Sequence, residues 1–312
     1  MDRGPPLRYL RRRPREVRME RIGFAGLGLM GHGMARNLLA KGFAMTVLAH
    51  RRREAVEDMV ARGAVEAADP ADLARRSDVV VLCLTGSPQV EAVVAAMGPG
   101  LREGMAVVDC STADPVSTDR LREDLGRRGV ALVDAPLSRT PKEAWEGTLD
   151  VMVGAEEADF ARLEPVLRAF AARVIRVGPP GAGHRMKLLN NFLSLGYGAL
   201  YAEALAVARK AGITVAAFDS VIRDGRMDCG FYRTFMGYAL EGDRNAHRFT
   251  LRNAHKDLRY LEGMANAAGV ATTMASAAKN SYALAVGLGG GGEEDYVPHL
   301  ADWIARANGA GA

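Results

Sequence analysis

A glycine-rich turn constrains the fold of this chain more than any other feature. It is Gly26-Leu27-Gly28-Leu29-Met30-Gly31, which follows the apolar segment Arg21–Ala25 and leads into a helical segment, His32–Lys41. In such a strand–turn–helix unit, the first glycine makes a tight turn, the second lets the backbone approach a pyrophosphate, and the third lets the helix pack on the strand. The helix N-terminus then faces the phosphates. The pattern therefore predicts a dinucleotide site formed by Gly26, Gly28, Leu29, Met30 and Gly31.

Strand and helix patterns alternate through the rest of the first half. We expect buried strands at Ala44–Ala49, Asp78–Leu84, Met105–Asp109, Val130–Asp134, Asp150–Val153 and Val174–Val177, with a helix over Ala158–Ala171 before the last strand. This alternation favours a mainly parallel, doubly wound α/β sheet of the Rossmann type. Ligands of such sheets bind beyond the carboxyl ends of the strands. We therefore expect Leu84, Ser111, Thr112 and the loop Ser138–Thr140 around one crevice.

The residues after the second predicted strand indicate which dinucleotide binds. An acidic residue at this position would bind the ribose 2′-hydroxyl of NAD. The chain has His50-Arg51-Arg52-Arg53 instead, and a guanidinium matches a phosphate in charge and geometry. The run predicts NADP rather than NAD, with Arg51 as the leading contact and His50 beside it. The alternative interpretation is a solvated basic turn.

One long helix, predicted over Gly181–Gly212, organises the second half of the chain. At 1.5 Å per residue it would run roughly 45 Å, enough to leave one domain and enter another. It is apolar on most sides, which is typical of a buried helix. The exceptions, Lys187, Asn190, Asn191 and Ser194, are spaced so that they share one stripe. Because buried polar groups need partners, the stripe is either a solvated or paired face, or the wall of a functional crevice.

The remaining pattern divides the chain into four parts. We expect a tail over residues 1–19, an NADP-binding Rossmann domain over 20–180, the interdomain helix over 181–212, and an all-helical substrate and oligomerisation domain over 213–312. The tail is basic and lacks the apolar segment of a secretory signal. We expect it to be disordered or spurious, with translation beginning at Met19.

Charge and cysteine content exclude several classes of protein. The net charge of +4, from 41 basic and 37 acidic residues, is too small to indicate nucleic-acid binding. No apolar run reaches the roughly 20 residues that a membrane span needs. Cys83, Cys110 and Cys229 are scattered without metal-ligand spacing, which favours a reducing, cytoplasmic compartment. We expect no metal site, no nucleic-acid partner and no membrane association.

Five segments together form a more specific pattern. They are GLGLMGHGMARNLLAKG at 26–42, DCST at 109–112, DAPLSRTPKEAWEGTLDVMVG at 134–154, GAGHRMKLLNN at 181–191 and HKDL at 255–258. Over about residues 20–308 the chain resembles the β-hydroxyacid dehydrogenase family, which includes 3-hydroxyisobutyrate dehydrogenase and tartronate semialdehyde reductase. The resemblance implies that Lys187 is catalytic, that Thr112 lies near the nicotinamide ribose and Lys256 over the cofactor, and that the protein is a homodimer or homotetramer.

The turn at residues 138–140 departs from the S-G-G sequence usual in that family. Ser138-Arg139-Thr140 is similar to the branch of sulfolactaldehyde reductase and 4-hydroxybutyrate (succinate semialdehyde) dehydrogenase, whose G-R-T-S turn carries an anion-binding arginine. The resemblance implies that Arg139 clamps the anionic end of the substrate; the alternative is an exposed loop arginine. Further substrate contacts are expected at Ser111, Ser138, Thr140, Asn190 and Ser194. For Ser111 and Thr112 the alternative is an ordinary turn.

The residue types suit reduction of an aldehyde. As hydride reaches the carbonyl carbon an alkoxide develops, and a positioned ammonium such as that of Lys187 can stabilise it and donate the proton. Asn191, one turn further on, can orient Lys187 or the substrate. We predict an NADP-dependent oxidoreductase that interconverts a small anionic β-hydroxyacid, ω-hydroxyacid or sulfonate and its semialdehyde. Alternatives are a 3-hydroxyisobutyrate or tartronate semialdehyde reductase, an imine-reducing relative and a silent nucleotide-binding scaffold; Lys187 argues against the last two.

Overall fold

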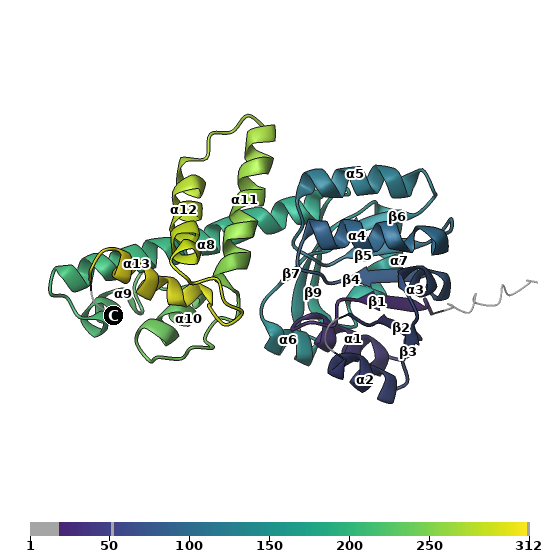
Figure 1. Ribbon diagram of the computed structural model, residues 1–312, viewed down its shortest axis with the longest axis horizontal. Coiled ribbons are helices and arrows are strands. Elements are labelled where there is room, and N and C mark those ends of the chain that lie inside the picture. The colour runs from purple at the N-terminus through teal and green to yellow at the C-terminus, as the bar shows by residue number, and fades with distance from the viewer. Residues whose placement is uncertain (1–18, 51–52, 311–312) are drawn as a thin grey trace, which may run out of the picture.

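The chain folds into a sheet flanked by helices and a separate bundle of helices, joined by one long helix. The computed structural model describes residues 19–50 and 53–310. Figure 1 shows the sheet-containing half and the helical half side by side, with α8 (Ala182–Lys210) reaching from one into the other. The expected architecture, a Rossmann-type sheet followed by an all-helical part that begins with a long helix, is confirmed.

The sheet has the strand order β3-β2-β1-β4-β5-β6-β8-β7, and β9 pairs with β8. The strands β1 to β6 are parallel neighbours, whereas β8 runs antiparallel to β6 and β7. Order 3-2-1-4-5-6 is that of a dinucleotide-binding sheet, whose crevice opens between β1 and β4. The strand bounds are β1 Ile22–Ala25, β2 Met45–Leu48, β3 Val65–Ala67, β4 Val79–Leu82, β5 Ala106–Asp109, β6 Ala131–Asp134, β7 Leu137–Ser138, β8 Leu149–Gly154 and β9 Ala171–Gly178.

Helices cover both faces of the sheet because successive strand residues point to opposite sides. Phe24 packs in a core with α1, α2 and α7, while its neighbour Ala25 packs in another core with α3, α4 and α5. Both strand faces are therefore apolar, as expected for a parallel sheet covered on each side. The bounds are α1 Gly31–Ala40, α2 Glu54–Ala61, α3 Pro70–Arg76, α4 Ser87–Met97, α5 Pro115–Gly126, α6 Pro141–Glu146 and α7 Glu157–Leu167.

In the sheet-containing half, the largest difference from the expected bounds lies between α7 and β9. The helix predicted to run to Ala171 ends at Leu167, and β9 begins at Ala171 rather than at Val174. The reason is the ladder with β8, in which Ala171 pairs with Leu149. Pairing with a neighbouring strand thus outweighs the helical pattern of the apolar residues at the helix end.

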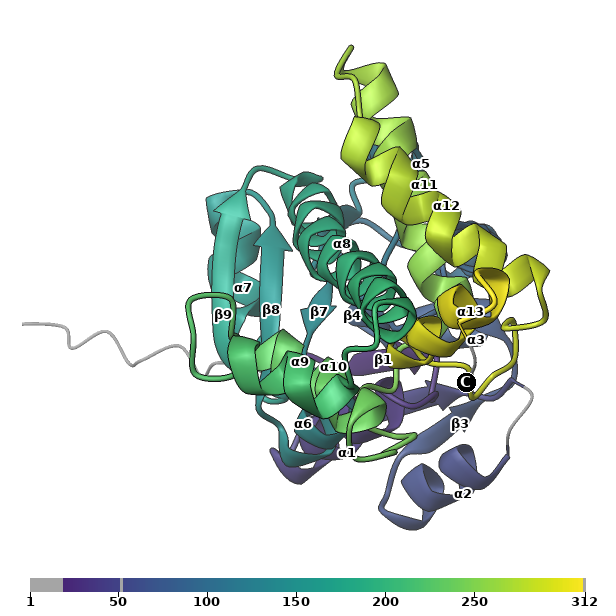
Figure 2. The same cartoon turned by 90° about the vertical axis from the view of Figure 1, so that its left-hand side faces the viewer.

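The second half contains helices packed around α8. They are α9 Val215–Ile222, α10 Gly230–Ala239, α11 Leu251–Ala267, α12 Thr273–Gly287 and α13 Leu300–Ala307, the last preceded by a short 3-10 turn at Val297–His299. Gly198 on α8 allows a close approach, since a Cβ there would lie 2.7 Å from the hydroxyl of Tyr282 on α12. Figure 2 shows α8 with β8 and β9 to one side and α11 and α12 to the other. Within the described ranges, no helix is long and apolar enough to cross a membrane.

The prediction that α8 is a buried helix is wrong for one of its apolar faces. The residues of that face recur every three, four or seven positions and are exposed: Met186, Leu189, Leu193, Tyr197, Leu200 and Val207. We call them the exposed apolar stripe. Other faces of α8 pack into the helical core. An apolar pattern does not reveal whether the cover comes from the same chain or from another one.

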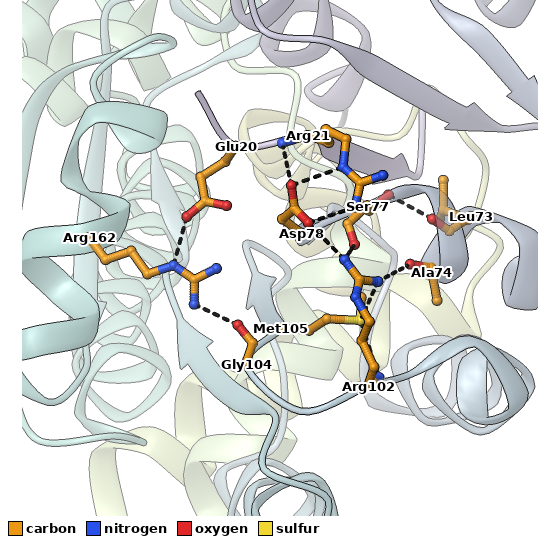
Figure 3. Close-up of polar contacts among 10 residues, drawn as sticks. All are labelled: Glu20, Arg21, Leu73, Ala74, Ser77, Asp78, Arg102, Gly104, Met105 and Arg162. Carbon is orange, nitrogen blue, oxygen red and sulfur yellow. Dashed lines mark hydrogen bonds and ion pairs between the residues drawn. The ribbon is translucent and has the colours of Figure 1, made fainter. Parts of the chain in front are cut away.

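A charged network fastens the chain at the start of β1, as Figure 3 shows. Asp78 accepts hydrogen bonds from the guanidinium of Arg21 at 2.7 and 3.0 Å, and from Arg102 at 2.7 Å. Arg162 of α7 donates to Glu20 at 2.7 Å and to the carbonyl of Gly104 at 2.9 Å. The hydrogen bonds from Arg21 hold the pKa of Asp78 well below its usual range. These contacts join the amino ends of several strands, at the edge opposite the crevice.

Candidate active site

A cavity of about 830 Å³ lies where the carboxyl ends of the strands meet the helical half. The glycine turn, the ends of β2, β4 and β5, and the loop after β7 line one side. The polar stripe of α8 lines it as well, together with parts of α10, α11 and the loop between them. Every predicted site residue that the structure describes lies on the wall of this cavity: Gly26, Gly28, Leu29, Met30, Gly31, His50, Leu84, Ser111, Thr112, Ser138, Arg139, Thr140, Lys187, Asn190, Asn191, Ser194 and Lys256.

The glycine turn has the geometry that a bound dinucleotide requires. Gly26 has φ +105°, and a Cβ there would collide with the carbonyl of Cys83. A Cβ at Gly31 would collide with the carbonyl of Gly26, so the turn closes tightly against the start of α1. Around Gly28, by contrast, no atom lies within 4 Å of the place where a Cβ would be. That open space faces the cavity and suits a pyrophosphate beside the backbone.

The end of β2 forms the part of the cavity expected to hold the adenosine end. Leu48, Ala49 and His50 line it there, and His50 is exposed. Arg51, the predicted leading contact, lies outside the described residues. The next arginine is already engaged, because Arg53 donates to both carboxylate oxygens of Glu66, at 2.7 and 3.1 Å.

Lys187 is a partly buried amine on the polar stripe of α8. Burial lowers its pKa to about 8; the carboxylate of Asp257 acts in the opposite direction, and Lys256 lowers the pKa further. Asn191 donates its amide nitrogen at 2.7 Å to Asp257, the same residue that acts on Lys187. An amine with this pKa exists in both protonation states near neutral pH, as an acid–base group needs.

Asp257 and Lys256 connect the helical half to the crevice of the sheet. The Lys256 ammonium donates to the carbonyls of Thr85 and Thr112, at 2.8 and 2.9 Å, and lies 3.0 Å from Asp257. Asp257 is buried, and its carboxyl group contacts Lys256 and Asn191. Asp257 was not among the predicted site residues, although its place directly after Lys256 in HKDL was a signal for it.

Several predicted substrate-binding hydroxyls already make hydrogen bonds within the chain. Ser111 accepts from the backbone amide of Leu84 at 2.9 Å. Thr140 is the N-cap residue of α6, and its hydroxyl donates to Glu143 at 2.5 Å in a capping box. Ser194 donates to the carbonyl of Asn191 at 3.1 Å. These hydroxyls shape the cavity wall, and each keeps lone pairs that a ligand can use.

Arg139 lies in the loop after β7 with a left-handed backbone, φ +85°. A non-glycine residue in this conformation is uncommon and costs free energy unless its surroundings hold it. Its Nε donates to Asp150 of β8 at 3.0 Å, and this hydrogen bond raises the pKa of Arg139. Because the contact uses Nε, the terminal nitrogens of the guanidinium remain for an anion.

Sequence reasoning missed a group of cavity residues from the helical half. They are Phe231 of α10, Asn253 of α11, and His247, Arg248 and Phe249 of the loop between those helices. Burial and the nearby Lys187 ammonium lower the pKa of His247 to about 4, so this imidazole is neutral at pH 7. No local pattern marks these residues, because only the packing of α10 and α11 brings them to the cavity.

Comparison with known proteins identifies the family. Residues 21–178 match the NAD binding domain of 6-phosphogluconate dehydrogenase, and residues 181–300 match the family described as NAD-binding of NADP-dependent 3-hydroxyisobutyrate dehydrogenase. The 3-sulfolactaldehyde reductase of Escherichia coli is 32% identical over 281 residues, which cover 88% of this chain and 93% of that protein. The chain belongs to the 3-hydroxyisobutyrate dehydrogenase-like β-hydroxyacid dehydrogenase family. It is an NAD(P)-dependent dehydrogenase that acts on CH–OH groups, and it binds a nucleotide and a small substrate.

Two further relatives support the assignment of the chain to this family. The 2-(hydroxymethyl)glutarate dehydrogenase of Eubacterium barkeri is 36% identical over 245 residues, which cover 76% of this chain and 80% of that protein. The structure of the 3-hydroxyisobutyrate dehydrogenase of Mycobacterium tuberculosis superposes with a TM-score of 0.80 at 25% identity, covering 90% and 98% of the two chains. The family expected from the five sequence segments is thus confirmed.

Proposed function

We propose that this dehydrogenase uses NADP to interconvert a small anionic β-hydroxyacid, ω-hydroxyacid or hydroxysulfonate and its semialdehyde, with Lys187 as the general acid and base. The observation that carries the proposal is the position of Lys187. Its amine, with a pKa of about 8, shares one cavity with the glycine turn and with Arg139. Two similar proteins are named for 3-sulfolactaldehyde and 2-(hydroxymethyl)glutarate, which supports an anionic substrate.

The roles of the chain's own residues follow from their chemistry. When bound, the nicotinamide supplies the hydride for reduction of the aldehyde, or accepts it in the reverse direction. The Lys187 ammonium donates a proton to the oxygen that becomes the hydroxyl, and its neutral amine takes that proton back during oxidation. Arg139 binds the anionic end of the substrate through its terminal nitrogens. Asp257 keeps enough of Lys187 protonated by opposing the effect of burial.

The proposed preference for NADP rests on the end of β2. The described cavity residues there, Leu48, Ala49 and His50, include no carboxylate. An acidic side chain in this place would bind a ribose 2′-hydroxyl and repel a 2′-phosphate. Arg51 stays the predicted phosphate contact, with His50 beside it.

We also propose that the dehydrogenase works as an oligomer of identical chains, joined through the exposed apolar stripe of α8. Leu193, Leu200 and Val207 of this stripe are 59%, 50% and 64% exposed. An exposed apolar surface of this kind typically marks a protein interface. We propose that a second copy of the chain covers this stripe. It would support from outside the helix that carries Lys187.

A substrate and cofactor screen tests the proposed reaction. The purified protein would be assayed with NADPH and with NADH against succinate semialdehyde, sulfolactaldehyde, methylmalonate semialdehyde and tartronate semialdehyde. We expect oxidation of NADPH with at least one of these, and loss of turnover in Lys187→Ala while the dissociation constant for NADPH stays nearly the same. Full activity of the variant would exclude Lys187 as the acid, and a preference for NADH would contradict the proposed cofactor.

A further inference from the structure

Arg248 brings a second arginine to the cavity, from the helical half. It lies in the loop between α10 and α11 and lines the cavity, as Arg139 does. Arg139 forms an ion pair with Asp150. The guanidinium of Arg248 is exposed and makes no hydrogen bond or ion pair with any residue of the described ranges. It is therefore a cation on the cavity wall without a counter-charge in the part of the chain that the structure describes.

The residue before Arg248 lies toward the catalytic end of the cavity. The ring of His247 lies 5.5 Å from that of Phe231 and 6.3 Å from that of Phe249. The same ring is close enough to Lys187 to be influenced by its charge. The segment 247–249 therefore borders the space beside Lys187, whereas the glycine turn and His50 belong to the part expected to hold the dinucleotide.

The cavity wall carries more positive than negative side chains. The cationic residues are Arg139, Lys187, Arg248 and Lys256, and the acidic one is Asp257. Asp257 lies 3.0 Å from Lys256 and so balances it. Asp150 already pairs with Nε of Arg139, so the terminal nitrogens of that guanidinium remain for one anionic group of the substrate. Since Lys187 serves the reacting oxygen, a substrate with that single group would leave Arg248 unmatched. A guanidinium can bind a carboxylate or a similar anion through two parallel hydrogen bonds.

We infer that Arg248 binds a second anionic group of the substrate, so that the enzyme prefers substrates with two acid groups, one at Arg139 and the other at Arg248. The inference rests on the proposed function and narrows its substrate class to dianions. It assigns Arg248 to substrate specificity rather than to proton transfer, which is the proposed role of Lys187.

Two alcohols that differ by one carboxylate test the inference. 3-Hydroxyisobutyrate and 2-(hydroxymethyl)succinate share the reacting CH₂OH and the adjacent carboxylate; the second compound has a carboxymethyl group where the first has a methyl group. With NADP, we expect kcat/KM of the wild type to be about tenfold or more higher for the dianion, as a hydrogen bond to a charged group implies. Arg248→Gln should remove most of that ratio through KM, and Arg248→Lys should restore part of it.

The matched control is Arg259→Gln on α11, an exposed residue outside the cavity that undergoes the same change of charge. It should leave the dianion-to-monoanion ratio as in the wild type. An unchanged ratio in Arg248→Gln would overturn the inference. An equal loss of kcat/KM for both alcohols, or a higher dissociation constant for NADP, would overturn it as well. A wild type that oxidises neither alcohol with NADP and reduces none of the four aldehydes with NADPH would instead overturn the proposed function itself.

Discussion

Lys187 illustrates how single residues acquire their chemistry from neighbours that are distant in sequence. Its spacing with Asn190, Asn191 and Ser194 is local, and it was enough to predict the polar stripe. Its pKa of about 8 depends on burial and on Asp257 and Lys256, which come from another helix. The bond from Asn191 to Asp257 could not be predicted either, because it needs the packing of α8 against α11.

The first prediction concerns the pH dependence of the reaction. If Lys187 is the acid and base, as proposed, kcat for reduction should fall as the pH rises through about 8, while kcat for oxidation should rise over the same range. Asp257→Asn should move both midpoints to lower pH, because the carboxylate favours the ammonium form. Profiles of kcat against pH in both directions measure this, and midpoints that stay unchanged in the variant would contradict it.

At the scale of elements, the first turn of α8 is capped by a residue from another element of the chain. Gly181 and His184 donate their backbone amides to the two carboxylate oxygens of Asp134, at 2.6 and 2.8 Å. Asp134 ends β6, far upstream, so the local pattern could place the start of the helix only from the two prolines before it. A carboxylate at this position also interacts favourably with the positive end of the helix dipole.

Removing this cap should destabilise the fold and disturb the site. We expect Asp134→Ala to lower the free energy of unfolding by about 1–3 kcal/mol, since buried amides lose their acceptor. The reaction should slow as well, because the first turn of α8 positions Lys187. Urea denaturation and kcat measure the two effects. Asp124→Ala, at an exposed position of α5, serves as control, and equal stability losses in both variants would rule out a capping role.

At the scale of the whole molecule, the sequence predicted the two halves but not how they meet. The glycine turn and the alternation of strands and helices were sufficient for the sheet, because both are local and periodic. The contacts that close the cavity, such as Lys256 with the carbonyls of Thr85 and Thr112, join segments far apart in the chain. The residues 247–249 were missed for the same reason.

The assembly of the molecule provides the last prediction. If the exposed apolar stripe of α8 is an interface, the wild type should have a mass of two or four chains in light scattering after size exclusion. Leu193→Asp should shift it to smaller species, because a charge would be buried in the contact. Val116→Asp, at an exposed apolar position of α5, should leave the mass unchanged. A wild type with the mass of one chain would refute the proposed interface.

The division of α8 into a core face, a cavity face and an apolar outer face has a practical consequence for redesign. Between Met186 and Leu200 its exposed residues are all apolar, so no side of this segment is free to accept arbitrary side chains. Changes made there to alter substrate choice would disturb packing or association at the same time. Arg139 and Arg248 lie on loops outside this helix, so libraries that vary these two positions should change substrate choice without altering either apolar face of α8.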